Sequence, residues 1–381
     1  MEEFYDLCLY IVDCYVQTNL IDYYKESFHT SLNDTILLFL EYYILPYFNI
    51  DDDTLLDVVE FSTNFYFDSI FIQRHNSPYN QTQEITPIIE HISSKPQPIQ
   101  RTIEWYMFRH NVITASSASK AFGTPANVNE LICSKCGDLD MNRYKPSFNT
   151  DGAMHWGVKY EHVSVEYYEY INQTKISEYG CITHDTIDYL AASPDGINTL
   201  PNHPLYGRLL EIKNPYSREI SGIPKDDYWV QCQLQMEVCG LDYCDFLETK
   251  FIEYESEEEF NADGTFLKTQ DDKFKGIIMY FVNQETFLYE YLPFQSTYEE
   301  YLKWEEKMME KHEMDMWIKT IYWKLEKVSC VLIERNKEWL KVALEHLQGI
   351  WTIITEEKHN GKWIERLPKK RINLQKADNQ L

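Results

Sequence analysis

The spacing of hydrophobic residues changes near residue 100, and the change separates two kinds of predicted structure. Before residue 76 the pattern is helical: "DTILLFLEYYILPYF" has apolar residues on every side and predicts a buried helix that stops before Pro46. "DDDTLLDVVEFSTNF" begins with acidic residues, which favour a helix N-terminus. Residues 76–100 contain four prolines among polar residues. The chain is therefore expected to begin with an acidic helical segment, residues 1–75, followed by a linker, residues 76–100.

Residues 101–295 alternate between helical and strand patterns. Two short helices joined by a turn are expected within 101–123, and an amphipathic helix is expected in "GVKYEHVSVEYYEYIN". Strands are expected in "ISEYGCITH", "YLAASPDGI", "GRLLEIKNP", "YCDFLETKFIEYE" and "KGIIMYFVNQETFLYEYLPF", with a helix, "DYWVQCQLQMEVCG", after the third. Residues 296–381 read as a charged helical extension with a basic tail. We predict an α/β core, residues 101–295, in which a central mixed sheet is flanked by helices, with helical additions at both ends.

The charge is strongly acidic but unevenly distributed. The chain has 35 basic and 61 acidic residues, a formal net charge of −26, and residues 1–95 hold 16 of the acids against three basic residues. Because carboxylates repel phosphates, this segment is not expected to contact DNA, and it is interpreted as a partner-docking or self-regulating module. A local groove or a bound metal elsewhere in the chain could still attract DNA.

Cysteine usage and the absence of an anchor indicate the compartment. Nine cysteines, an odd number in a chain of 381 residues, suggest free thiols in a reducing environment. The start "MEEFYDLCLY" lacks a basic signal region, and no apolar run approaches the roughly 20 residues that span a bilayer. We expect an intracellular, cytoplasmic protein without a membrane partner.

The stretch from Asp195 to Lys213 carries the most distinctive chemistry. Side chains of a strand repeat every two residues, so Glu211 and Lys213 are expected on one face and Ile212 on the other. A hairpin-like return would place Asp195 beside Glu211, and Glu161, on an upstream helix, is a third acid. Carboxylates held this closely favour a divalent cation, Mg²⁺ or Mn²⁺, in a two-ion site. The alternative is a charge-balanced structural cluster, with Glu161 as a solvated helix acid.

A second motif, "CSKC", contains Cys133 and Cys136. A lone pair of cysteines at this spacing is weak evidence for zinc, which normally needs four ligands. Free thiols are the favoured interpretation, and whether the pair binds a metal is left open.

The ordered set "HWGVKYE", "SPDG", "LLEIKNP" and "YWVQCQLQM" resembles the lambda-type exonucleases, also called YqaJ-like viral recombinase nucleases, of the PD-(D/E)XK superfamily. The resemblance covers about residues 101–295. It implies that Glu161, Asp195, Glu211 and the backbone carbonyl of Ile212 are metal ligands and that Lys213 is the catalytic lysine. Gln231 matches the family glutamine that positions the water or the lysine. Gln235 lies one helical turn further on, and either glutamine could instead be an ordinary exposed helix residue.

The same resemblance implies a site for a 5′ phosphate. "RHNVITASSASKAFG" is similar to the family's N-terminal signature, in which Arg109 and Ser116 would hold that phosphate. An Arg offers a bidentate fork, and a Ser that caps a helix lies beside free N–H groups that favour an anion. The alternative for Ser116 is a plain cap. Lys120, one turn further in, and Arg218, one residue nearer to the lysine than in the family pattern, are additional candidates.

The resemblance implies a Mg²⁺- or Mn²⁺-dependent deoxyribonuclease, an exonuclease that digests one strand from a 5′-phosphorylated duplex end, 5′ to 3′, in DNA recombination, repair or genome defence. The source would be a large DNA virus, and the location the host cytoplasm or a viral factory. Its partners would be double-stranded DNA ends, a single-strand annealing protein or helicase, and further copies of the chain in a dimer or trimer. A restriction-like endonuclease and a non-catalytic DNA-binding recombination scaffold are the alternatives.

Overall fold

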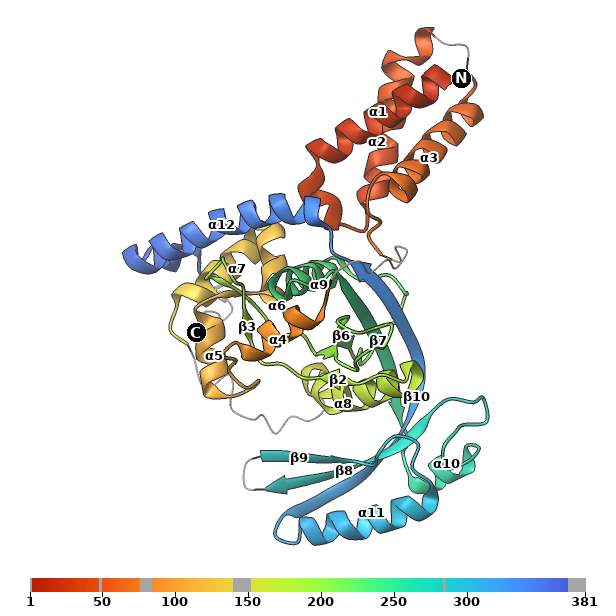
Figure 1. Cartoon of the computed structure of the whole chain (residues 1–381), viewed down its shortest axis with the longest axis vertical. Helices are drawn as coiled ribbons and strands as arrows, with labels where there is room; N and C mark the ends of the chain where they lie inside the picture. Colours follow the sequence, from red (N-terminus) through yellow and green to blue (C-terminus); the bar gives the residue numbers. More distant parts are fainter. Residues whose placement is uncertain (1, 48–49, 76–83, 140–151, 284–285, 369–381) are drawn as a thin grey trace, which may run out of the picture.

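A seven-stranded mixed sheet forms the centre of the molecule (Figure 1). The computed structural model describes residues 2–47, 50–75, 84–139, 152–283 and 286–368. The strand order is β2-β5-β6-β7-β10-β8-β9, in which β6 and β7 run parallel and the other neighbouring pairs antiparallel. The predicted α/β class with a central mixed sheet is confirmed. The strands are β2 (Ile176–Ser177), β5 (Gly196–Asn198), β6 (Leu209–Lys213), β7 (Tyr243–Glu253), β8 (Lys275–Asn283), β9 (Thr286–Tyr291) and β10 (Met316–Glu334).

Helices cover both faces of this sheet. Alternation along β6 sends Leu209 into the hydrophobic core that contains α9 (Asp226–Cys239), whereas Leu210 and Ile212 pack into a separate core with Tyr168 of α8 (Ala153–Asn172). The prediction that Ile212 faces the other side of the strand and packs there is thus confirmed. The helix predicted to end at Gly240 is α9, and Gly240 adopts the left-handed conformation that a C-terminal cap requires.

The predicted strand "YLAASPDGI" is two strands in two different sheets. β4 (Leu190–Ala192) pairs with β1 (Ile113–Thr114) and β3 (Ile182–Thr183) in a small three-stranded sheet, whereas β5 belongs to the large one. Residues 193–195 connect them and contain Pro194, which has no N–H to donate to a ladder. The break leaves Asp195 at the start of β5, beside β6. "ISEYGCITH" divides in the same way, into β2 and β3.

The chain after residue 296 is only partly helical, so the prediction of a helical extension is wrong for residues 316–334. α11 (Tyr298–Lys311) and α12 (Lys337–Asn360) are helices, but β10 lies between them and pairs with β7 on one side and β8 on the other. This part of the chain completes the central sheet. The division of the chain at residues 75, 100 and 295 otherwise stays a prediction.

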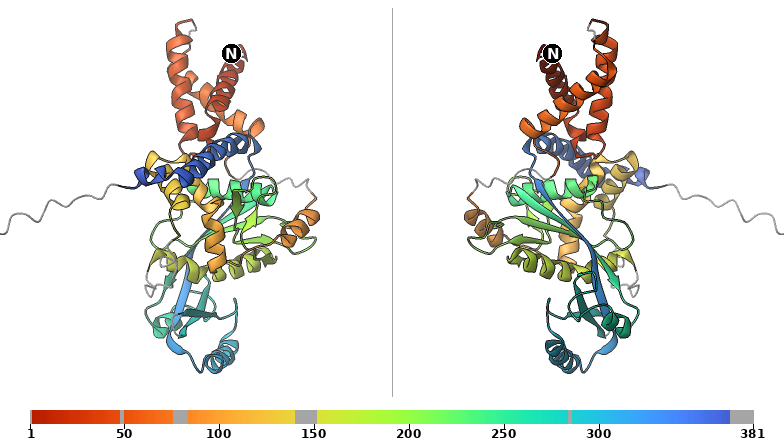
Figure 2. Two further views of the ribbon diagram at one scale, coloured as in Figure 1. Left: turned by 90° about the vertical axis from the view of Figure 1, so that its left-hand side faces the viewer. Right: turned by 90° about the vertical axis from the view of Figure 1, so that its right-hand side faces the viewer.

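The N-terminal helices form an arm that projects from the body of the molecule (Figures 1 and 2). They are α1 (Glu2–Thr18), α2 (Phe28–Tyr43) and α3 (Asp52–Ser69), as the helical pattern predicts. The expected burial of α2 on every side is wrong: Leu32, Ile36 and Leu40 are buried, but Leu38 and Tyr42 are exposed. In an arm of three helices, each helix has partners on one side only.

The base of the arm is packed into the body. Tyr23 lies against Trp229 of α9, whose Nε1 donates to the carbonyl of Arg74 at 2.6 Å. Trp229 in turn lies against Trp339 of α12 with ring centroids 4.9 Å apart. Both tryptophans are fully buried. Residues before 76 therefore supply part of the core around α9.

The predicted linker contains a packed helix. α4 (Thr86–Ser94) buries Ile89 and Ile92. Ile85, just before this helix, packs closely on Gly207: a Cβ on Gly207 would lie 2.3 Å from Cγ2 of Ile85. Residues 76–83 lie outside the described residues, so the linker prediction is corrected for 86–94 only. Within the described residues, no helix combines the length and apolar character needed to cross a bilayer.

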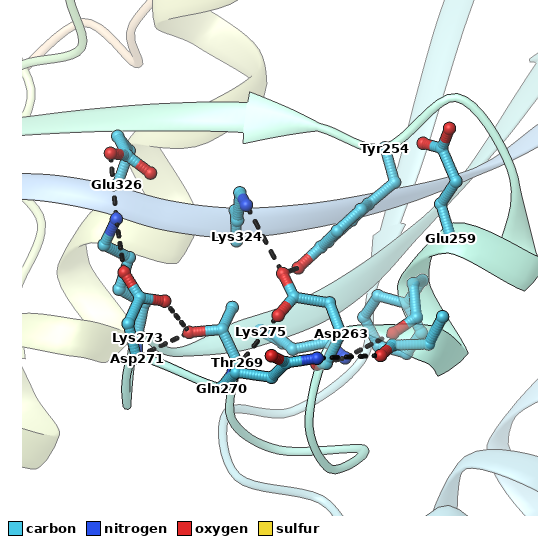
Figure 3. A network of polar contacts seen from close by, with 12 residues as sticks. Tyr254, Glu259, Asp263, Thr269, Gln270, Asp271, Lys273, Lys275, Lys324 and Glu326 are labelled. Carbon is cyan, nitrogen blue, oxygen red and sulfur yellow. Dashed lines mark hydrogen bonds and ion pairs between the residues drawn. The ribbon is translucent and has the colours of Figure 1, made fainter.

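A polar network holds the loop between β7 and β8 against the sheet (Figure 3). The buried ammonium group of Lys275 donates to the backbone carbonyls of Asp263 at 2.7 Å and Thr265 at 2.8 Å. The Asp263 carboxylate accepts from the Tyr254 hydroxyl at 2.7 Å and pairs with Lys324 of β10 at 3.3 Å. The loop, which carries the short helix α10 (Glu257–Ala262), is thereby tied to β8 and β10.

Candidate active site

The centre of the site is the carboxylate of Glu211, which is 1% exposed. Gln231 donates its Nε2 to Oε1 at 2.7 Å, and Gln235 donates its Nε2 to Oε2 at 2.6 Å. The Lys213 ammonium also contacts Oε1. The glutamines are one helical turn apart on α9, so both reach the same face of β6. Both are buried, and the alternative that they are exposed helix residues is wrong.

Asp195 lies next to Glu211, as the hairpin-like return predicts. β5 and β6 are antiparallel, with Gly196 opposite Leu210, and the Ile212 N–H donates to Asp195 Oδ2 at 2.7 Å. Burial raises the pKa of Asp195 well above its usual value, and the negative charges of Glu211 and Glu161 add to this shift. The three carboxylates line the same cavity, and the charges of the other two act on Asp195.

Glu161 reaches the same place from α8. Its Oε2 accepts from Arg101 Nη2 at 2.9 Å. Burial raises the pKa of Glu161, and the Arg101 charge offsets part of that shift. Arg101 itself has a backbone φ of +67°, a conformation that costs energy for any residue with a Cβ. The sequence reading did not single out Arg101, because its role depends on a contact with a helix 60 residues further along the chain.

Lys213 is a cation in this environment. Burial by itself lowers its pKa, but the charges of Glu211 and Asp195 outweigh that effect, and the pKa lies above the usual lysine value. Its ammonium group also lies 5.1 Å from the centroid of the Tyr228 ring. The arrangement therefore suits charge stabilisation by Lys213 better than removal of a proton by it.

The three acids, Lys213, Gln231 and Arg101 line one cavity of about 640 Å³; Gln235 lies behind Glu211 and is not part of its lining. The cavity also contains three of the four residues that were expected to hold a 5′ phosphate, Arg109, Ser116 and Arg218. The structure thus brings together residues from α5 (Ile103–His110), α6 (Ala115–Ala118), α8, β6 and α9. Lys120 does not line this cavity; it pairs with Glu130 of α7 (Pro125–Cys136) at 2.6 Å.

The three cavity residues expected to hold the phosphate have partners of their own. Arg109 Nη2 donates to Ser116 Oγ at 2.8 Å, and its guanidinium lies 4.2 Å from the centroid of the Trp105 ring. Arg218 pairs with the buried Glu248. Ser116 is not the helix cap: Thr114 occupies the cap position and Ser117 completes the capping box. Ser116 lies one residue into the helix, so its hydroxyl is turned to Arg109.

The oxygen-rich donor set fits Mg²⁺ or Mn²⁺ in its chemistry. Within the described residues, however, no three His, Cys, Asp or Glu side chains are gathered as a ready metal cage. Arg101 and Lys213 occupy positions beside Glu161 and Glu211 and compensate their charge. The acids are therefore suited to a divalent ion, but their present neighbours are cations of the chain itself.

The cysteine pair is part of the helix packing. Cys133 Sγ is 3.6 Å from the Trp363 carbonyl, and Cys136 Sγ is 3.4 Å from the Ile354 carbonyl, each within reach of a weak S–H donor. Burial raises the pKa of both thiols, that of Cys136 to about 11. All nine cysteines are free. These contacts favour structural thiols.

The chain is similar to a family of viral recombinase domains and to an uncharacterized viral protein. Residues 104–242 match the model of the YqaJ-like viral recombinase domain. Over 356 residues the chain is 31% identical to an uncharacterized protein of Acanthamoeba polyphaga mimivirus, a match that covers 82% of this chain and 63% of that relative. The chain thus spans less than two thirds of the length of that relative.

Two solved structures are also similar. They are crystal structures of the alkaline exonuclease LHK-Exo from Laribacter hongkongensis, one of them in complex with dAMP. Each is 20% identical to this chain with a TM-score of 0.40, and each match covers 69% of this chain and 98% of the other.

Proposed function

We propose that the chain is a DNA exonuclease that acts in recombination, because residues 104–242 match the model of the YqaJ-like viral recombinase domain. In its finer form, the proposal is a metal-dependent deoxyribonuclease that hydrolyses one strand of duplex DNA, 5′ to 3′, from a 5′-phosphorylated end. The observation that carries it is the single cavity that holds both the acid–lysine cluster and the arginines Arg109 and Arg218.

The chain's own residues divide the work between the two parts of that cavity. The terminal 5′ phosphate is held by Arg109, Ser116 and Arg218, because guanidinium groups offer several N–H donors to phosphate oxygens. The next phosphate lies at the acid cluster, where a water molecule attacks phosphorus and the bond to the leaving 3′ oxygen breaks. Lys213 stabilises the negative charge that develops on the phosphate, and Gln231 keeps Glu211 in place.

Glu161, Asp195, Glu211 and the carbonyl of Ile212 would hold Mg²⁺ or Mn²⁺. When bound, the ion supplies positive charge that makes the convergence of three carboxylates and a phosphate tolerable. Arg101 and Lys213, which now compensate two of the acids, are then available to the DNA backbone.

Digestion of linear duplexes with a 5′ phosphate or a 5′ hydroxyl tests this proposal. Charge-assisted hydrogen bonds contribute about 1.5–3 kcal/mol each, so we expect the hydroxyl end to be digested about 10–100-fold more slowly. Glu211→Ala and Lys213→Ala should abolish digestion, whereas Lys341→Ala, which removes an exposed lysine of α12, should not. Equal rates on the phosphorylated and hydroxyl ends would contradict the proposed recognition of the 5′ phosphate. Cleavage of covalently closed circles would indicate an endonuclease.

Protein partners and assembly belong to the same proposal. A single-strand annealing protein or a helicase would use the strand that digestion exposes, and a dimer or trimer would keep the enzyme on the DNA. Sedimentation of the full chain with and without a duplex end would distinguish these assemblies from a monomer.

A further inference from the structure

The last turns of α2, on the projecting arm, expose a cluster of large apolar side chains. Leu38, Phe39, Tyr42 and Tyr43 are 65%, 41%, 81% and 61% exposed. Leu38 and Tyr42 are four residues apart, as are Phe39 and Tyr43, so the four side chains form two neighbouring rows on one helix. The ring centroids of Phe39 and Tyr43 are 5.1 Å apart, and those of Tyr42 and Tyr43 are 5.8 Å apart. We call this continuous surface the arm patch.

The arm does not use the arm patch for its own packing. α2 is held to the rest of the arm by other side chains, since Leu32, Ile36 and Leu40 are buried. The Thr63 hydroxyl of α3 also donates to Asn33 Oδ1 of α2 at 2.9 Å. α2 runs outward from the body, so the arm patch lies near the free end of the arm (Figures 1 and 2). Apolar surface exposed in this way marks a site of interaction.

The surroundings of the arm patch are acidic. Residues 26–73 contain nine acidic residues and no lysine or arginine. Two of these acids, Asp34 and Glu41, are exposed on α2 within about one turn of Leu38. Because carboxylates repel phosphates, neither DNA nor an anionic lipid surface fits this part of the arm. The occupant must therefore bring apolar side chains together with positive charge.

A second copy of the chain lacks the required charge. Residues 1–75 hold 14 acidic and two basic residues, and residues 76–381 hold 47 acidic and 33 basic residues, so both parts are net negative. In a symmetric dimer formed through the arm patch, Asp34 and Glu41 would also face the same acids of the other copy. Contact between copies at this surface would bring like charges together, which opposes association.

We propose that the arm patch is a docking surface for a basic amphipathic segment of a different protein. The apolar side chains of that segment cover the four residues of the arm patch, and its lysines or arginines pair with Asp34 and Glu41. The apolar contacts supply most of the affinity, whereas the charges favour the right partner and speed association. The inference goes beyond the proposed function and does not depend on it, because no residue of the arm patch lines the cavity that holds the acid cluster.

Fluorescence anisotropy of a short labelled peptide, titrated with the full chain, tests the inference. The probe is an amphipathic helical peptide of leucine and lysine, which carries an apolar face and positive charge. A scrambled peptide of the same composition keeps the charge without the apolar face, and a leucine–glutamate peptide keeps the face with the opposite charge. We expect the leucine–lysine helix to bind at least tenfold more tightly than either control peptide.

A double variant of the arm patch locates the binding. Leu38→Gln with Tyr42→Gln removes apolar surface from two exposed positions and should weaken binding of the leucine–lysine helix at least tenfold. The matched control is Leu302→Gln with Met309→Gln, which changes two half-exposed apolar residues of the acidic helix α11 and should leave the affinity unchanged.

A charge-reversed variant tests the acids separately. Asp34→Lys with Glu41→Lys keeps the apolar side chains of the arm patch and reverses the charge beside them. It should weaken binding of the leucine–lysine helix and strengthen binding of the leucine–glutamate helix, each at least about threefold. This measurement also decides the inference if the double variant of the arm patch does not fold.

Three results would overturn the inference. Equal binding of the scrambled peptide would show attraction by charge alone. Unchanged binding by Leu38→Gln with Tyr42→Gln would place the binding elsewhere on the chain. Self-association in sedimentation that this double variant abolishes would make a second copy the occupant. The peptide titrations contain no DNA, so their outcome is independent of whether the chain digests DNA ends.

Discussion

Replacement of Gln235 by leucine tests how the buried Glu211 carboxylate is held. The two oxygens of this carboxylate are treated differently by the described residues. Oε1 is contacted by both Lys213 and Gln231, whereas the one side-chain donor that the described residues place on Oε2 is Gln235, at 2.6 Å. Leucine has a similar volume and no donor, so Gln235→Leu leaves Oε2 buried without this bond.

The expected cost follows from these contacts. A hydrogen bond to a charged group contributes about 1.5–3 kcal/mol to stability. The amide oxygen of Gln235 is itself buried and has no hydrogen-bond partner among the described residues, so its removal returns about 1 kcal/mol. The free energy of unfolding should therefore fall by about 0.5–2 kcal/mol. Because groups that orient the ligands of a reactive site change activity by about 10–100-fold, digestion of a 5′-phosphorylated duplex should slow by that factor.

Gln233→Leu is the matched control. Gln233 is equally buried on the same helix, but it bonds the Glu334 carbonyl and the Asn336 N–H on the side away from the site. Urea unfolding and single-turnover digestion of both variants give the comparison. The control should lose stability and keep its rate. If Gln235→Leu also kept its rate, or if the control lost as much activity, the proposed support of Glu211 by Gln235 would be refuted.

Four other changes probe the fold. Burial and, to a smaller extent, the charge of a neighbouring arginine lower the pKa of Lys135 to about 7. Between that pH and about 10.4, the unfolded chain therefore binds a proton that the folded chain has released, and the free energy of unfolding rises with pH. Lys135→Met should flatten this rise in urea unfolding from pH 7 to 9; unchanged slopes would contradict it. Gly349→Ala places a Cβ in open space on a helix and should raise stability by about 0.5–1 kcal/mol. Gly180→Ala places a Cβ against the backbone and should lower stability by about 1–3 kcal/mol. Thermal unfolding that ranked the two variants in the other order would contradict the packing described around these glycines. Deletion of residues 1–75 uncovers Trp229 and should leave the remainder aggregated; a monomeric, digesting remainder in sedimentation would oppose this.

Local periodicity was sufficient to predict the direction of a side chain where that direction depends only on the residue's own helix or strand. Alternation along one strand placed Glu211 and Lys213 on the same side, and a separation of four residues placed Gln231 and Gln235 on one side of a helix. Gly240 marked the helix end correctly, because a left-handed cap is a local requirement. The sequence also indicated most helices and strands of the core, but the predicted strands "YLAASPDGI" and "ISEYGCITH" each divide between the two sheets, and α7 was not predicted.

One further assignment needed the tertiary structure because its cause lies far along the chain. Arg101 is placed at the site by its ion pair with Glu161, which is 60 residues further on. Arg101 belongs to no local pattern that distinguishes it from other arginines.

By itself, the sequence determined that this protein has a mixed α/β core and which acids, lysine and glutamines would share a face, since side-chain direction follows from the helix and strand repeats. Only the tertiary structure decided that β10 completes the sheet, that the arm is anchored on α9, and that Arg101 lies beside Glu161. The many charged residues along β10 suggest a solvated helix, and its strand conformation is stabilised by pairing with β7 and β8, each separated from it in sequence. Pairing of that kind is a property of the folded chain as a whole, because the free energy of a strand comes from its neighbours rather than from its own residues.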